Sequence, residues 1–133
     1  MLRYMLDTNI CIYTIKNNPA AVREKFQQHQ NHLCISSIVL SELLYGAEKS
    51  SQPEKSLALI EGMAARLEVL NFDEHAAAHA AEIRADLARK GTPIGHYDVL
   101  IAGHARSRCL VLVGNNLREF ERVDGLRLKN WVG

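Results

Sequence analysis

Tyr4-Met5-Leu6-Asp7-Thr8-Asn9 is the stretch that decides the fold, because a short apolar run ends there on an acid that is followed by two good helix caps. Residues 3–6 are too few for a helix, so we predict a β-strand there. Thr8 or Asn9 is expected to cap a helix that runs to about Asn17. In an open parallel sheet, ligands bind beyond the carboxyl ends of the strands, which is where Asp7 would lie.

The rest of the chain repeats this alternation of short apolar runs and longer helical stretches. Further strands are expected at residues 33–35, 67–70 and 110–113, with a short edge strand at 126–128. Helices are expected from Pro19 to about His29, from a Ser36 or Ser37 cap through Ala47, across residues 57–64 after a break at 50–54, from an Asp73 cap to Lys90 with Gly91 at its end, and over residues 98–107. Such alternation predicts a parallel α/β sheet, in a single domain over residues 1–133.

Composition limits the classes of partner without selecting one. The chain has 133 residues, a net charge of +1 and an apolar fraction of 47%, enough for a sizeable core. Because nucleic-acid binders are often much more basic, any basic surface here must be local. For any single basic residue, a solvated charge is the simpler explanation. Candidates for a local basic surface are Arg84, Arg89, Lys90, Arg106, Arg108, Arg118 and Arg122.

The cysteines indicate a reducing environment. Cys11, Cys34 and Cys109 are odd in number and sit in apolar runs, so we expect them to be reduced and buried. No Cys-x-x-Cys occurs, which argues against a structural zinc site. With no cleavable signal pattern and no apolar run approaching ~18 residues, a cytoplasmic location without a membrane span is expected.

Four acids fall where a metal-dependent nuclease would place them: Asp7, Glu42, Asp98 and Glu119. All can be placed at the carboxyl end of one parallel sheet. Carboxylates that are brought together repel and raise one another's pKa, so a hard divalent cation is the usual reason to gather them.

Each acid also has a simpler explanation. Asp7 and Asp98 can each cap a helix, and capping is compatible with metal binding. Glu42 lies among apolar residues that suggest packing on the sheet, but it can equally face solvent. Glu119 follows the Asn115-Asn116 turn and can be an ordinary surface residue.

Other chemistries find less support. His75 and His79 have the i, i+4 spacing of helical zinc sites, but no Glu follows His75 and no third ligand is evident. His104 lies in an apolar helix, where a hydrogen-bonded core histidine is the simpler expectation. No glycine-rich phosphate loop, Gly-x-Ser-x-Gly or Cys/His nucleophile pairing appears.

Together these motifs resemble the PIN-domain ribonucleases, and among them the VapC toxins of bacterial VapBC toxin–antitoxin pairs. The resemblance covers essentially the whole chain. It is carried by Met5-Leu6-Asp7-Thr8-Asn9-Ile10-Cys11-Ile12, Ile35-Ser36-Ser37 with Ser41-Glu42-Leu43-Leu44-Tyr45-Gly46, Gly95-His96-Tyr97-Asp98 with Ile101-Ala102-Gly103-His104-Ala105, and Asn115-Asn116-Leu117-Arg118-Glu119-Phe120. Each motif alone is weak, and their occurrence together in this order is a strong signal.

The resemblance implies both a fold and a site. The fold is a three-layer α/β/α sandwich with a mostly parallel sheet of four or five strands. Asp7, Glu42 and Asp98 are expected to ligate Mg²⁺ or Mn²⁺, and Glu119 to complete the acidic pocket. Thr8, Asn9 and Asn116 are expected to bind substrate or support the ligands. One position departs from the family, because Gly114 stands where Thr or Ser is usual, and Asn116 is expected to take over part of that role.

The resemblance also implies partners. RNA would be the substrate, and similarity to enterobacterial VapC toxins implies cleavage of initiator tRNA in the anticodon stem-loop. A VapB antitoxin would inhibit the enzyme, and toxin–antitoxin complexes would bind operator DNA through the antitoxin. We also expect a homodimer, since the helices after Pro19 and Pro53 carry more apolar positions than one sheet face needs.

Two alternatives remain open from the residues. In an aspartyl-phosphate phosphatase, Asp7 would be the nucleophile, but that chemistry needs a second acid two residues on, where Asn9 stands. In a receiver-like interaction module, the acids would hold Mg²⁺ without catalysis. RNA cleavage that depends on a metal would distinguish the nuclease from both.

Overall fold

A parallel sheet forms the centre of the molecule in the computed structural model, which describes residues 1–132. Its strands lie in the order β3-β2-β1-β4-β5, and every neighbouring pair is parallel. The strands are β1 (Tyr4–Leu6), β2 (Leu33–Ser36), β3 (Glu68–Leu70), β4 (Val111–Gly114) and β5 (Arg127–Asn130). The predicted strands are confirmed, except that the edge strand β5 extends to Asn130 instead of ending at Leu128.

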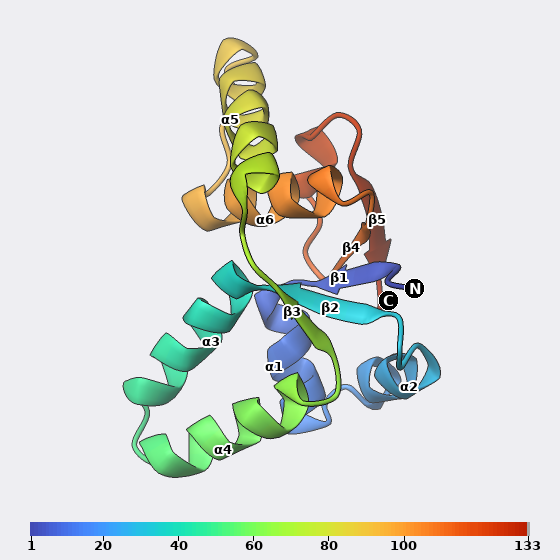
Figure 1. Ribbon diagram of the computed structural model, residues 1–133, viewed down its shortest axis with the longest axis vertical. Coiled ribbons are helices and arrows are strands. Elements are labelled where there is room, and N and C mark those ends of the chain that lie inside the picture. The colour runs from blue at the N-terminus through green and yellow to red at the C-terminus, as the bar shows by residue number, and fades with distance from the viewer. Residues whose placement is uncertain (133) are drawn as a thin grey trace.

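Helices cover both faces of this sheet, as the sandwich prediction required (Figure 1). They are α1 (Thr8–Lys16), α2 (Ala20–Gln28), α3 (Ser37–Glu48), α4 (Pro53–Ala64), α5 (Glu74–Arg89) and α6 (His96–Ser107), with a short 3₁₀ helix, η1 (Phe120–Arg122), before β5. Figure 1 shows α1 to α4 on one side of the sheet and α5 with α6 on the other. Right-handed crossovers require this division, because the chain first steps from β1 to β3 and then reverses to reach β4.

Three helix starts differ from the predictions. The cap of α1 is Asp7, whose Oδ1 accepts the Ile10 N–H at 2.9 Å, so Thr8 and Asn9 are helical residues instead. Helix α6 begins at His96 after a Gly95 cap, which places Asp98 inside the first turn and not at the cap. Helix α4 already begins at Pro53, inside the expected break, because the fixed φ of proline suits a first helical position.

Other predicted helix ends are confirmed. Ser36 caps α3 by accepting the Ile38 N–H, and Asp73 caps α5 by accepting the Ala76 N–H. After α5, Gly91 adopts a φ of +70°, and the Thr92 N–H reaches back to the Leu87 carbonyl at 2.9 Å. This arrangement satisfies the last carbonyls of the helix, and glycine adopts the required left-handed conformation without a steric penalty.

The core lies on both faces of the central strands. β1, β2 and β4 are buried almost throughout, because helices cover them on both sides. Cys11 and Cys34 are free and buried as predicted, but Cys109 is exposed. The prediction for Cys109 was wrong because the residue forms a turn of positive φ between α6 and β4, outside the core. In the described part of the chain, no helix is both long and apolar enough to cross a membrane.

Candidate active site

Asp7 lies at the carboxyl end of β1 and is only 8% exposed. Burial raises the pKa of this carboxyl to about 6, and repulsion from Glu42 adds to that rise. Backbone hydrogen bonds from Ile10 and Asn9 act in the opposite direction by stabilising the charged form. The helix cap and the acidic site therefore share one side chain, and neither interpretation excludes the other.

Glu42 reaches the same region from α3 and is half-buried. The Thr8 hydroxyl donates to Glu42 Oε1 at 3.1 Å, which fixes one carboxylate oxygen above the start of α1. Burial raises the pKa of Glu42, while the Thr8 hydrogen bond lowers it. Glu42 therefore faces the site and not open solvent.

Asp98, in the first turn of α6, lies beside Glu119 from the segment after β4, and the two carboxyls can share a hydrogen bond when one of them is protonated. The pKa of Asp98 is raised to about 6, chiefly by burial and then by the Glu119 hydrogen bond. Repulsion from Glu119, Glu42 and Asp7 raises it further. The Asp98 carboxyl thus interacts electrostatically with the other three acids, so the structure places all four predicted acids in one region.

This acidic cluster sits where the chain reverses direction across the sheet. β1 lies between β2 and β4, and the Asp7 N–H donates to the Val113 carbonyl at 2.9 Å. In open α/β sheets, the crevice beyond the carboxyl ends at such a reversal is the usual ligand site.

Gly114 lies directly against Asp7. A Cβ added at Gly114 would lie 2.7 Å from Asp7 Oδ2 and 2.9 Å from Leu117 Cδ2, so the Asp7 carboxylate would have to move. Glycine thus permits a close approach of Asp7 to β4 that Thr or Ser would disturb. Asn116, expected to compensate for the missing hydroxyl, is exposed, and in the described residues no hydrogen bond joins it to Asp7.

Two contacts near the cluster were not predicted. The Asn115 amide donates to the Tyr13 hydroxyl of α1 at 3.0 Å, and the Asn115 carbonyl accepts from the Asn130 amide. These contacts tie the end of β4 to α1 and β5. Their only signal in the sequence was the Asn-Asn pair, which indicates a turn.

His79 and His104 each make a structural contact within the fold. His79 Nδ1 accepts from Arg106 Nε at 2.9 Å, which links α5 to α6 and does not suggest a zinc site. His104 is 1% exposed, and its Nδ1 pairs with the Ser36 hydroxyl at 2.8 Å, as expected for a core histidine, whereas its buried Nε2 has no partner among the described residues.

The donor set of the acidic cluster fits a hard divalent cation, since it consists of carboxylate oxygens, and a cation would relieve the repulsion that Asp98 feels from the other three acids. Within residues 1–132, however, no three His, Cys, Asp or Glu side chains form a ready metal cage. A cation such as Mg²⁺ tolerates this, because it keeps several waters and needs only one or two direct carboxylates plus substrate phosphate.

Comparison with known proteins adds to this geometry. The family model described as PIN domain matches residues 4–126. The tRNA(fMet)-specific endonuclease VapC of Shigella flexneri is 61% identical over 98% of this chain and 99% of its own length. Ribonuclease VapC2 of Haemophilus influenzae is 52% identical over 99% of this chain and 100% of its own length. The structure of DNA-bound VapBC from Salmonella typhimurium superposes with a TM-score of 0.95 at 61% identity, covering 98% of this chain and 99% of that one.

Proposed function

The chain belongs to the PIN-domain family, and from this premise we propose that it is a metal-dependent endoribonuclease of the VapC type. It hydrolyses phosphodiester bonds in RNA, and initiator tRNA is the proposed target. The observation that carries the proposal is the Asp7, Glu42, Asp98 and Glu119 cluster, in which Asp98 can share a hydrogen bond with one acid and is repelled by all three. The names and high identity of the VapC relatives support the reaction and the substrate.

Asp7, Glu42 and Asp98 would hold the cation, directly or through water, and Glu119 would complete the pocket. Mg²⁺ is the proposed metal, with Mn²⁺ as a substitute, since both prefer oxygen ligands. When bound, the cation would polarise the scissile phosphate and lower the pKa of a water.

The chain's own residues prepare this site. Thr8 orients Glu42 through their hydrogen bond, and Gly114 leaves room for Asp7. Because the pKa of Asp98 is about 6, this carboxyl is mostly deprotonated at neutral pH, and in that form it can bind a cation. Asn9 and Asn116 are exposed at the rim of the crevice, where they could contact RNA.

A VapB-type antitoxin is the proposed inhibitor, as the VapBC complexes among the similar structures suggest. Its apolar segment would lie along the early helices, and an Arg would enter the acidic cluster as a bidentate cation. A cavity of about 370 Å³ lined by residues of α1, α2 and α4, including Phe26, Leu59 and Met63, supports this placement. The assembled complex would bind operator DNA through the antitoxin, as the DNA-bound relative suggests.

The two alternatives have less support. A receiver-like module has the sheet order 2-1-3-4-5, which places its first strand between the second and third, whereas here β1 lies between β2 and β4. For the phosphatase, Asn9 stands where the second acid is needed, and its side chain is exposed.

The test is incubation of purified, antitoxin-free protein with total bacterial RNA in millimolar Mg²⁺, Mn²⁺ or chelator, followed by mapping of the cut ends. The proposal predicts discrete, metal-dependent cuts, concentrated in the anticodon arm of initiator tRNA. Intact RNA in every metal would contradict the nuclease, whereas discrete cuts in another RNA would contradict only the proposed target.

A further inference from the structure

An exposed aromatic ring stands beside the acidic cluster. Tyr97 precedes Asp98 in the first turn of α6 and is 58% exposed. In the part of the chain that the structure describes, its side chain has no hydrogen bond and no ring or cation contact. Tyr45, the other largely exposed tyrosine, is instead covered by the Lys49 ammonium, 4.9 Å from its ring centre. Tyr97 therefore presents a free planar face next to the proposed site of cleavage.

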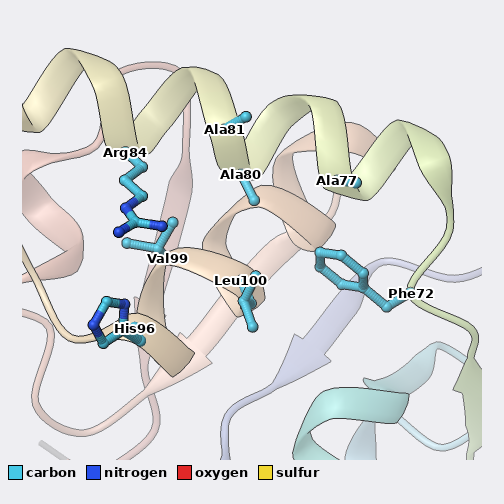
Figure 2. A pocket seen from close by; sticks show the side chains of 8 residues that line it. All are labelled: Phe72, Ala77, Ala80, Ala81, Arg84, His96, Val99 and Leu100. Atoms are coloured by element: carbon cyan, nitrogen blue, oxygen red, sulfur yellow. The ribbon is translucent and has the colours of Figure 1, made fainter.

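The pitch of α6 places Tyr97 between the acids and the α5 helix. Successive helical residues point about 100° apart. Asp98 faces the acidic cluster, whereas His96, Val99 and Leu100 line a cavity of about 350 Å³ together with residues of α5 (Figure 2). Tyr97 points between these two directions, so a strand leaving the acids toward α5 would pass its ring.

A free cation lies at the end of that path. Figure 2 shows the Arg84 side chain extending from α5 toward α6, with His96 lining the same cavity. Arg84 is exposed, and among residues 1–132 the structure gives it no ion pair. Two other cations of this region are engaged, since Lys90 pairs with Asp86 and Arg106 pairs with Glu82.

The acidic cluster repels phosphate, so RNA affinity must come from groups around it. We propose that Tyr97, Arg84 and His96 bind one unpaired nucleotide next to the scissile phosphate. The base stacks on the Tyr97 ring, and the neighbouring phosphate lies between Arg84 and His96. This proposal rests on the ribonuclease function and adds the direction in which the substrate strand leaves the acids. A ring of this kind requires an unstacked base, which favours a loop over a paired stem.

Binding without cleavage tests the site directly. In chelator, a labelled RNA hairpin with the anticodon-arm sequence of initiator tRNA is titrated with wild type and variants. Tyr97→Ala should weaken binding roughly 5- to 100-fold, and Tyr97→Phe should retain it, because stacking needs the ring and not the hydroxyl. Arg84→Ala should reduce the slope of log affinity against log salt by about 0.7–1. Arg89→Ala, an exposed cation farther along the same helix, should change neither quantity.

Kinetics in Mg²⁺ give a second readout. Tyr97→Ala should raise KM by a similar factor and leave kcat within a few fold at saturating RNA. Wild-type affinity and KM for Tyr97→Ala would overturn the nucleotide site, and a changed oligomeric mass with unchanged RNA affinity would assign the ring to a protein interface instead. Wild-type protein that binds the hairpin through Tyr97 yet cuts no RNA would contradict the nuclease while supporting this site.

Discussion

The two carboxylate oxygens of Asp7 serve different parts of the structure. Oδ1 caps α1 by accepting the Ile10 N–H, and Oδ2 lies against Gly114 at the end of β4. Burial makes the charged form unfavourable and raises the pKa to about 6 from an ordinary value of 3.8. The cap can be preserved without the charge, because Asn caps helices about as well as Asp.

Asp7→Asn should therefore stabilise the metal-free protein at neutral pH. A carboxyl whose folded pKa is raised contributes stability below its unfolded pKa, and that contribution is lost as pH rises through the folded value. The rise in the pKa of Asp7 from 3.8 to about 6 corresponds to a loss of about 3 kcal/mol of unfolding free energy at neutral pH. We expect Asp7→Asn to gain about 1–3 kcal/mol of unfolding free energy at about pH 7.5 and nothing at about pH 3, as measured by urea unfolding.

Asp73→Asn is the matched control for that experiment. Asp73 caps α5 with the same geometry, its Oδ1 accepting the Ala76 N–H at 2.9 Å, but it is exposed and its pKa is lowered, chiefly by that hydrogen bond. The control should give no gain at neutral pH. Equal responses of the two variants would show that capping, and not burial in the acidic cluster, governs Asp7.

Thr8 tests the orientation of Glu42. In the wild-type protein, the hydrogen bond from the Thr8 hydroxyl lowers the pKa of Glu42. Thr8→Val removes this hydrogen bond and should therefore raise that pKa further. Cleavage at neutral pH should fall about tenfold, and the acidic limb of the pH–rate profile should move to higher pH. Thr8→Ser should restore both. A Val variant with an unchanged profile would show that this contact does not matter for activity.

At the scale of elements, α5 and α6 are held unusually close at Gly103. A Cβ there would lie 2.5 Å from the Ala80 backbone nitrogen and 2.6 Å from its Cα, and neither backbone atom can rotate away. Because α6 carries Asp98, this contact also fixes one acid relative to the others.

Gly103→Ala should destabilise the fold by about 1–3 kcal/mol or more, since α6 would have to shift away from α5. Gly62→Ala is the control, because Gly62 is exposed in α4 with no atom within 4 Å of an added Cβ. The control should gain about 0.5–1 kcal/mol from helix propensity. Thermal unfolding of both variants gives the comparison, and a Gly103→Ala protein as stable as Gly62→Ala would contradict the close packing.

The sequence predicted strands better than helix starts. β1 and β4 were readable because each is a short apolar run ending at polar residues. The cap of α1 could not be predicted from the sequence, since Asp7, Thr8 and Asn9 all suit the position and tertiary contacts decide among them. The start of α6 was placed late because Gly95, His96 and Tyr97 lack an apolar pattern.

The sequence predicted that the four acids lie at one end of the sheet but not which residues they contact, and their roles as metal ligands remain predictions. Asp7 follows a strand, and Asp98 and Glu119 lie at helix starts, where sequence patterns locate them, whereas Glu42 lies in the middle of α3. The Asn115–Tyr13 contact joins residues 102 positions apart, and no local pattern encodes such a pairing. The effect of Gly114 likewise depends on the position of Asp7, which only the folded chain defines.

For the whole molecule, metal should act as a stabilising ligand. Asp7 and Asp98 both have pKa values raised to about 6, so repulsion grows as pH rises toward neutrality. Millimolar Mn²⁺ should raise the Tm of wild type at about pH 7.5 and have less effect at about pH 5, because it binds only the folded, deprotonated site. Asp98→Asn should lose most of this response and Asp73→Asn should keep it. Equal Mn²⁺ shifts in both variants would show that the acids are not one metal site.

A homodimer remains a prediction, although its original reason is weakened. Most large apolar side chains of α2 and α4 pack inside the chain, Val22, Phe26, Ile60 and Met63 among them. Of the large ones in these two helices, Leu59 is the one that stays largely exposed, at 50%. Light scattering at micromolar concentration should still give twice the chain mass without antitoxin. Leu59→Ser tests the proposed helices, because a dimer unaffected by that change must use another surface.

Cleavage of purified initiator tRNA in Mg²⁺, by wild type and by Asp98→Asn side by side, tests the central claim most directly. Asp98 is the acid that contacts or senses the other three, so its charge should be needed for catalysis while the fold persists. We expect wild type to cut the tRNA at one place only when metal is present, and Asp98→Asn to be at least 100-fold slower, a loss of about 3 kcal/mol or more of transition-state stabilisation, with an unchanged circular dichroism spectrum. Folded Asp98→Asn protein that cuts at the wild-type rate would contradict the assignment of the acidic cluster as the active site.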